Sequence, residues 1–247
     1  MKAYALTDIG RIRSINQDAL FFSTEPVGPL PSLFIVADGM GGHKAGDFAS
    51  RYLVEHLASC IRASRARGTA AVLREAIDAV NGELYRLACD REELSGMGTT
   101  LVAAVVEQDT LTVANVGDSR LYLIERSGIR QVTRDHSFVE EMVSRGQMKR
   151  ESREYRNQKN IITRAVGIGS HVEADFFEIP LAPGSYILLC SDGLTNMVDN
   201  ATIFRLVLLP GPLEERARAL TREANQNGGR DNIAVVLVDP QISEVRR

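Results

Sequence analysis

Four aspartates in this sequence stand beside apolar, strand-like runs, each close to a glycine or another small turn residue: Asp38, Asp118, Asp192 and Asp231. LFIVA leads into Asp38 and YILLCS leads into Asp192, whereas Asp231 precedes IAVVLV. A buried strand that ends in a carboxylate presents a hard oxygen ligand at the rim of a sheet, and Mg²⁺ and Mn²⁺ prefer such ligands. Aspartate is also a common turn residue, because its side chain caps its own backbone. One such site alone would therefore mean little, but four together predict a metal-centred active site.

The apolar pattern predicts an α+β fold around these residues. Short β-rich runs fill the start of the chain, and two amphipathic helices follow over about 49–61 and 72–87. Residues 99–133 are dense in strands whose connections are too short for parallel crossovers, so these strands must pair as antiparallel hairpins. Two more helices precede the last strand, IAVVLV. Antiparallel blocks with paired helices predict sheets inside and helices outside.

Residues 145–164 differ in character from the rest of the chain. This segment has seven basic and two acidic residues, in a chain whose net charge is −3. It follows a short helix that Ser137 and Glu140 should open as a capping box and that Gly146 should end. A charge run is usually a solvated loop. The alternative is a mobile surface flap that meets an anionic substrate, and the sequence leaves both readings open.

Composition and charge narrow the function classes. Apolar residues make up 44% and charged residues 25%, which is typical of a globular protein. The overall net charge of −3 does not suggest general binding to nucleic acid, so we expect no nucleic-acid partner. The three cysteines form no CxxC pair and are expected to be reduced packing residues. With no signal-peptide stretch and no apolar run near the roughly 18 residues of a membrane span, we expect a cytoplasmic protein without a membrane partner.

Further motifs extend the metal hypothesis. DGMGGHKAG places four glycines and His43 directly after Asp38, and GDSR, SDGL and RDN contain the other three aspartates. TDIGRIRSINQD sets Arg13 five residues before Asp18. In this order the motifs resemble the metal-dependent serine/threonine phosphatases of type 2C, and most closely the bacterial single-domain members. The resemblance covers nearly the whole chain.

The resemblance implies a fold of two central antiparallel β-sheets flanked by pairs of α-helices, an α-β-β-α sandwich. It implies one catalytic domain over residues 1–240, with a flap at about 145–165 and a short C-terminal tail over 241–247. Such a domain is expected to act as a monomer.

The resemblance also implies a site for two Mn²⁺ or Mg²⁺ ions, with a third ion in bacterial relatives. Asp38 would bridge two ions, and the carbonyl of Gly39 would complete one of them. Asp192 and Asp231 would bind the ion on the other side. Asp118 and Asp192 match the positions that hold the third ion.

Residues around the ions receive roles from the same resemblance. Arg13 matches the arginine that grips the substrate phosphate, and His43 matches the histidine that protonates the leaving oxygen. Asp18 and Asn232 would support the ligands. Gln17 stands where many relatives have a glutamate that orients a metal-bound water. Because the amide keeps a hydrogen-bond acceptor but loses a charge, one ion would bind more weakly.

The chemistry of these residue types agrees with a phosphatase. A phosphate monoester carries about two negative charges, which paired cations and a planar guanidinium neutralise well. The alkoxide of serine or threonine leaves poorly and needs a general acid. We therefore expect hydrolysis of phosphoserine and phosphothreonine by direct attack of a water or hydroxide that bridges two ions.

Phosphorylated proteins are the expected partners, and the sequence leaves open a serine/threonine kinase or a regulatory protein as the substrate. One alternative is a non-catalytic phosphoprotein-binding or regulatory module on the same fold, which loss of a metal aspartate would favour. A two-metal nuclease is a second alternative, and it would require a basic surface.

Overall fold

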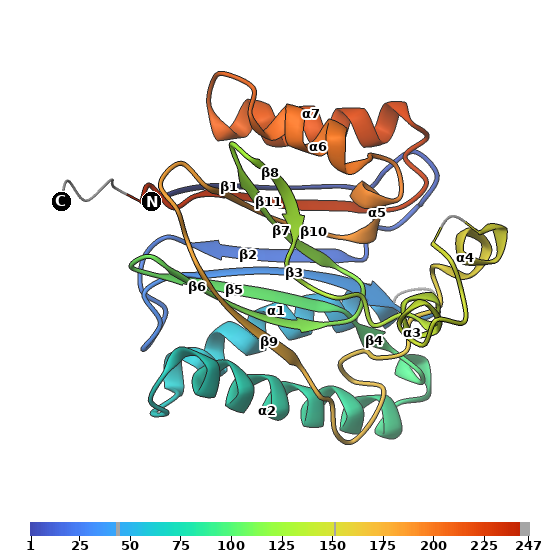
Figure 1. Ribbon diagram of the computed structural model, residues 1–247. Coiled ribbons are helices and arrows are strands. Elements are labelled where there is room, and N and C mark those ends of the chain that lie inside the picture. The colour runs from blue at the N-terminus through green and yellow to red at the C-terminus, as the bar shows by residue number, and fades with distance from the viewer. Residues whose placement is uncertain (43–44, 151, 243–247) are drawn as a thin grey trace.

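The chain folds around two antiparallel β-sheets that stack face to face (Figure 1). The computed structural model describes residues 1–42, 45–150 and 152–242. The β1 sheet has the strand order β1 (Lys2–Asp8), β11 (Ile233–Asp239), β10 (Tyr186–Cys190), β7 (Arg120–Glu125) and β8 (Gly128–Gln131). The β2 sheet has the order β2 (Asp18–Ser23), β3 (Leu33–Met40), β5 (Leu101–Glu107), β6 (Thr110–Val116) and β9 (Asp175–Pro180), and β4 (Gly98–Thr99) pairs with β3. All these pairings are antiparallel, which confirms the hairpins predicted for the middle of the chain.

Paired helices cover the outer face of each sheet (Figure 1). The β2 sheet carries α1 (Ala45–Ala63) and α2 (Thr69–Asp90), and the β1 sheet carries α6 (Asn200–Val207) and α7 (Leu213–Gln226). The predicted α-β-β-α sandwich is therefore confirmed. The connections contain short helices: α3 (Phe138–Ser144), α4 (Arg153–Gln158), α5 (Asp192–Thr195) and a 3-10 turn over Glu92–Leu94.

Strand β11 shows why the central strands are apolar along their whole length. Every residue from Ile233 to Val238 is buried. Ala234, Val236 and Val238 point into the core between the two sheets, whereas the alternate residues point into the core under α6 and α7. Because side chains of a strand alternate between its faces, a strand covered on both sides needs a continuous apolar run. IAVVLV is such a run.

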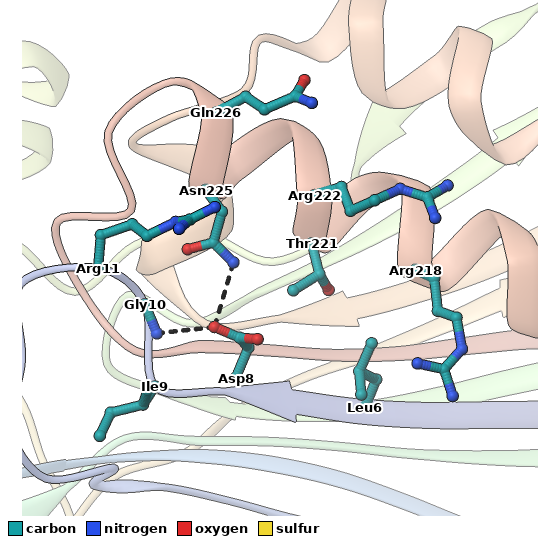
Figure 2. Close-up of a pocket in the computed structure, with 10 residues that line it drawn as sticks. All are labelled: Leu6, Asp8, Ile9, Gly10, Arg11, Arg218, Thr221, Arg222, Asn225 and Gln226. Atoms are coloured by element: carbon teal, nitrogen blue, oxygen red, sulfur yellow. Dashed lines mark hydrogen bonds between the residues drawn. The ribbon is translucent and has the colours of Figure 1, made fainter.

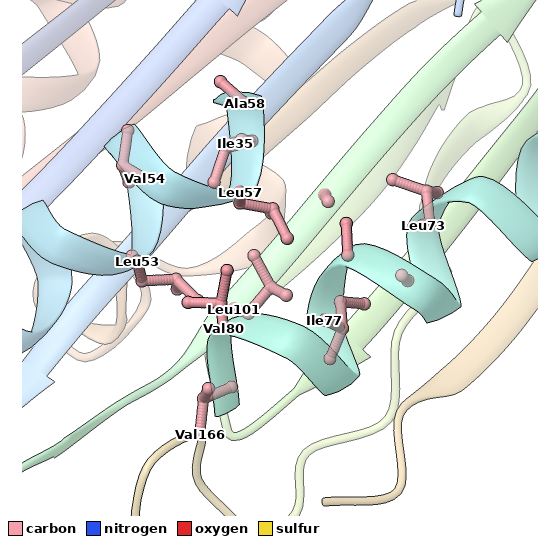
Figure 3. Packing of buried hydrophobic residues seen from close by; sticks show 14 of the residues in the cluster. Ile35, Leu53, Val54, Leu57, Ala58, Leu73, Ile77, Val80, Leu101 and Val166 are labelled. Atoms are coloured by element: carbon pink, nitrogen blue, oxygen red, sulfur yellow. The ribbon is translucent and has the colours of Figure 1, made fainter. Parts of the chain in front are cut away.

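The core under α1 and α2 forms from two helical stripes. Leu53 and Leu57 of α1 and Ile77 and Val80 of α2 meet over the β2 sheet (Figure 3). Residues three or four apart lie on one face of a helix, so the periodicity predicted this contact. Gly68 separates the two helices with a φ of +90°, a backbone conformation that favours glycine.

The basic segment 145–164 contains the short helix α4, which lies with α3 at one end of the sandwich (Figure 1). The hydroxyl of Ser137 caps α3 by accepting from the backbone N–H of Glu140, as predicted. The second contact of the predicted capping box, in which Glu140 would accept from the backbone N–H of Ser137, is wrong. The carboxylate of Glu140 accepts instead from Arg150, at 2.6 Å and 3.1 Å, because the guanidinium is a stronger donor than a backbone amide.

The sequence also led to expectations about the cysteines, membrane spans and the C-terminal tail. All three cysteines are free, and Cys190 is buried in the core under α6 and α7 as expected, but Cys89 is exposed and is therefore not a packing residue. Across the ranges that the structure describes, no helix has the length and apolar character needed to cross a membrane. Most of the predicted tail, residues 243–247, lies outside the described residues.

Candidate active site

Strand register brings three of the predicted aspartates to one end of the β1 sheet. Cys190, the last residue of β10, is paired with Arg120, the first residue of β7. Asp192 and Asp118 each lie two residues beyond this pair, so they share the same end of the sheet. Asp231 lies two residues before β11, at the same end. Residues that are distant in sequence thus meet because the strands are antiparallel.

The β2 sheet contributes its carboxylates at the matching end. Asp18 and Asp38 are directly paired across β2 and β3. Residues 117–119 carry the chain from β6 of this sheet to β7 of the other, which places Asp118 between the sheets. Gly117 makes this passage with a φ of +99°, in the left-handed region where a side chain would be strained. The two sheets together therefore surround one group of carboxylates.

A cavity of about 270 Å³ opens at this end of the sandwich. It has walls from both sheets and from the chain that follows α4. Eight of the predicted site residues line it: Arg13, Gln17, Asp38, Gly39, Asp118, Asp192, Asp231 and Asn232. His43 lies outside the described residues. The structure therefore brings together most of the residues that the motifs selected.

Asp18 lies behind the cavity and is almost fully buried. Its Oδ2 accepts a hydrogen bond of 2.7 Å from the hydroxyl of Ser191, and its Oδ1 has no partner among the described residues. The pKa of Asp18 is raised to about 8, first by burial and then by the carboxylates of Asp192 and Asp231, against the lowering effect of Ser191. Asp18 therefore lies behind the cavity without lining it, and burial favours its neutral form.

Three carboxylates that line the cavity, those of Asp38, Asp118 and Asp192, also have raised pKa values. The pKa of Asp118 is raised to about 8 by burial and by Asp192, and that of Asp192 to about 6 by burial and by Asp231. Burial and the carboxylates of Asp18 and Asp192 hold the pKa of Asp38 well above its usual range. Like charges close together in a poorly solvated site oppose ionisation in this way.

A divalent cation would fit this group of side chains. It would favour the ionised carboxylates and give a partner to Oδ1 of Asp118 and Oδ1 of Asp192, which are buried without a hydrogen bond among the described residues. Hard oxygen donors are those that Mg²⁺ and Mn²⁺ prefer. Within the described part of the chain, no three His, Cys, Asp or Glu side chains already form a cluster that could hold a metal. The fit therefore rests on charge and on the unpaired oxygens.

Arg13 and Asn232 organise the rim of the cavity. Nη2 of Arg13 donates to Oδ2 of Asp231 at 2.8 Å. The amide of Asn232 donates to the carbonyls of Ile9 and Ile15, at 2.9 Å and 3.0 Å, and accepts from the backbone of Gln17 at 2.8 Å. Asn232 thus fixes both ends of the loop that carries Arg13, which gives the asparagine of the RDN motif a positioning role.

Two of the predicted aspartates lie in different local structures from those expected. Asp38 is not at a turn after a strand but inside β3, because Gly39 and Met40 continue the strand by pairing with β4. Asp192 opens the short helix α5, where its carboxylate accepts from Asn196 at 2.8 Å. Both still face the cavity.

Several residues at the site were not found from the sequence. Asn160 and Ile162, which follow α4, line the cavity. Ser191 holds Asp18, and Thr100 accepts the backbone N–H of Asp38 at 2.9 Å. Ser191 could have been selected for its hydroxyl next to SDGL. No local pattern distinguishes the other three.

A cavity larger than the candidate active site lies elsewhere. It has a volume of about 540 Å³ and lies between the end of β1 and α7 (Figure 2). Asp8 at its base accepts from the backbone of Gly10 and from Asn225, at 2.8 Å and 3.1 Å. None of the predicted site residues lines it. Size therefore does not identify the active site, whereas the group of carboxylates does.

Known proteins are similar in sequence to this chain over nearly its full length. The protein phosphatase 2C family matches residues 11–237. The serine/threonine phosphatase of Listeria monocytogenes is 41% identical over 100% of this chain and 99% of that protein. The protein phosphatase PhpP of Streptococcus pneumoniae is 38% identical over 96% of this chain and 97% of its own length.

Solved structures share the fold as well. The serine/threonine phosphatase Stp1 of Staphylococcus aureus has a TM-score of 0.88 at 37% identity, with 96% of this chain and 93% of that chain covered. A serine/threonine phosphatase of S. agalactiae has a TM-score of 0.89 at 36% identity, with 96% and 98% covered. Because the match extends over sequence, fold and nearly the full length, the chain belongs to the protein phosphatase 2C family.

Proposed function

We propose that this chain is a metal-dependent phosphatase that hydrolyses phosphoserine and phosphothreonine in proteins. The observation that carries the proposal is the group of carboxylates at one end of both sheets, three of which have a buried oxygen without a described hydrogen-bond partner: Asp18, Asp118 and Asp192. The names of the relatives, which are serine/threonine phosphatases, support the substrate class.

We propose that residues of this group of carboxylates are the metal ligands. Asp38, the carbonyl of Gly39, Asp192 and Asp231 would hold two Mn²⁺ or Mg²⁺ ions, and Asp118 with Asp192 would hold a third. Bound ions of this kind neutralise phosphate charge and lower the pKa of the attacking water. The chain's own part is to hold the oxygen ligands in place before substrate arrives, and the two paired strands β2 and β3 do this for Asp38.

Arg13 would bind the substrate phosphate. Its side chain is 49% exposed and donates to Asp231 through Nη2. The guanidinium has further donors, so it can bind a phosphate oxygen at the mouth of the cavity. Asn232 holds the loop in the position that this contact needs.

His43 would donate the proton to the departing serine or threonine oxygen. This assignment rests on the resemblance of DGMGGH to the family motif, since His43 lies outside the described residues. Asp18 would support the ligands from behind the cavity, where it accepts the hydrogen bond from Ser191 next to Asp192. Gln17 contributes through its backbone, where its N–H donates to Asn232 and its carbonyl accepts from Gly39 at 3.0 Å.

Phosphate release from a phosphothreonine peptide tests the proposal. The purified chain should release phosphate with added Mn²⁺ or Mg²⁺, stop in excess chelator, and recover when the metal is restored. Asp192→Asn and Asp231→Asn should lose turnover, whereas the control Asp78→Asn, an exposed residue of α2, should keep it. Full turnover by metal-stripped protein would refute the metal mechanism.

A phosphoprotein-binding module on the same fold is the alternative function. Such a module would bind the phosphothreonine peptide with metal present and release no phosphate. Phosphorylated proteins are the proposed partners, and a serine/threonine kinase and a regulatory protein are both candidates for the substrate.

A further inference from the structure

Lys159 lies in a small cavity next to the candidate active site. This cavity has a volume of about 180 Å³ and includes Asp118 and Asp192, which also line the active-site cavity. Lys159 follows α4 directly and is half-buried. Burial lowers the pKa of Lys159, and the carboxylate of Asp192 opposes that effect. The lysine is therefore near enough to this carboxylate to interact with its charge.

The chain on both sides of Lys159 is fixed to the rest of the protein. Before it, the hydroxyl of Tyr155 donates to Oε1 of Glu140 at 2.6 Å. After it, the backbone N–H of Phe138 donates to the carbonyl of Ile161 at 2.8 Å. These two contacts hold the end of α4 over the aspartates, so the position of Lys159 follows from the packing of the flap.

The cavity contains a second cation, but that cation is already paired. Arg120 donates to Asp135 through Nε and Nη2, the latter at 2.7 Å, and through Nη1 to Tyr122. Lys159 has no such hydrogen bond or close ion pair among the described residues. Oδ1 of Asp118 is also buried without a described partner. The cavity thus contains an ammonium group and a carboxylate oxygen that each lack a hydrogen-bond partner among the described residues.

We propose that Lys159 is a tethered cation for Asp118 and Asp192, and that a divalent ion must displace it to bind this pair. The inference rests on the proposed function, because it takes these two aspartates as ligands of the third ion. An ammonium and a divalent ion repel each other strongly in a poorly solvated cavity. Binding of the ion therefore moves the ammonium of Lys159 away from the two aspartates. The ammonium of Lys159 and the most weakly bound ion therefore compete for the carboxylates of Asp118 and Asp192.

Mn²⁺ binding, measured by calorimetric titration, tests the competition. Lys159→Met removes the charge and keeps most of the side-chain length, so it should tighten the weakest Mn²⁺ site by roughly tenfold or more. Lys149→Met removes the same charge from an exposed position of the same segment and should bind like the wild type. Lys159→Arg keeps the charge and should also stay close to the wild type. An unchanged or weaker site in Lys159→Met overturns the proposal.

Thermal unfolding separates this role from a structural one. Lys159→Met should lower Tm in metal-free protein, because the carboxylates lose their cation, and the difference should vanish at saturating Mn²⁺. An equal loss of Tm in both conditions would mean that Lys159 only supports the fold, and would overturn the proposal. If Mn²⁺-dependent hydrolysis is intact while Lys159→Met binds like the wild type, this inference fails alone. If no protein binds Mn²⁺, the proposed function fails with it.

Discussion

Arg13→Ala should weaken phosphate recognition and leave stability almost unchanged. In the structure, Arg13 and Asp231 form an ion pair of 2.8 Å whose side chains are 49% and 32% exposed. Water screens such a pair, so its loss should cost about 0–1 kcal/mol of unfolding free energy. A hydrogen bond from the guanidinium to a phosphate dianion is worth about 1.5–3 kcal/mol. Its loss predicts a fall in kcat/KM of roughly 10- to 100-fold.

The assay compares kcat/KM on a phosphothreonine peptide at saturating Mn²⁺ with the free energy of unfolding in urea. Arg11→Ala is the matched control, since Arg11 is exposed on the same loop and lines the cavity beside α7 instead. Arg13→Lys should recover part of the loss, because an ammonium keeps the charge but not the planar fork. Equal kcat/KM for Arg13→Ala and Arg11→Ala would refute the phosphate role. A loss of several kcal/mol in stability would show that Arg13 is structural.

Three further variants test other parts of the site. His43→Ala should cost on the order of 10²–10⁴ in kcat on a phosphothreonine peptide, the usual scale for a general acid. It should cost much less on p-nitrophenyl phosphate, whose leaving group needs no proton, and a uniform loss would reject the assignment. Asp135→Ala leaves the guanidinium of Arg120 unpaired and largely buried, so urea unfolding should show a loss of about 3 kcal/mol; a loss below about 1 kcal/mol would contradict the structure. Gly193→Ala would press its Cβ on a backbone carbonyl of the RDN motif, and should cost about 1–3 kcal/mol and weaken Mn²⁺ binding. Gly82→Ala, where a Cβ meets nothing within 4 Å, is its control and should not destabilise the protein.

Much of the fold could be predicted because its elements are encoded locally. The continuous run IAVVLV predicted a strand, and the stripe that includes Leu53 and Leu57 predicted a helix. The order of strands could not be predicted, since it depends on contacts between distant segments. The passage of residues 117–119 from one sheet to the other is such a feature. Nothing in the GDSR sequence indicates that its neighbouring strands belong to different sheets.

The site residues also divide into those that a local pattern predicts and those that depend on distant contacts. The aspartates could be selected because each adjoins an apolar run, but their supports come from elsewhere in the chain. Ser191 binds Asp18 across 173 positions of sequence. Glu140 matched a local capping pattern, but its carboxylate binds Arg150, ten residues later, because that partner is charged. Tertiary contacts of this kind override local patterns and cannot be derived from them.

A crystal structure grown with Mn²⁺, with anomalous scattering used to locate the ions, tests the central claim most directly. We expect strong anomalous peaks about 2.1 Å from carboxylate oxygens of Asp38, Asp192 and Asp231, the distance typical of a small hard cation. The same preparation should release phosphate from a phosphothreonine peptide. An active, Mn²⁺-loaded protein with peaks elsewhere, and none at these oxygens, would show that these aspartates are not the metal ligands.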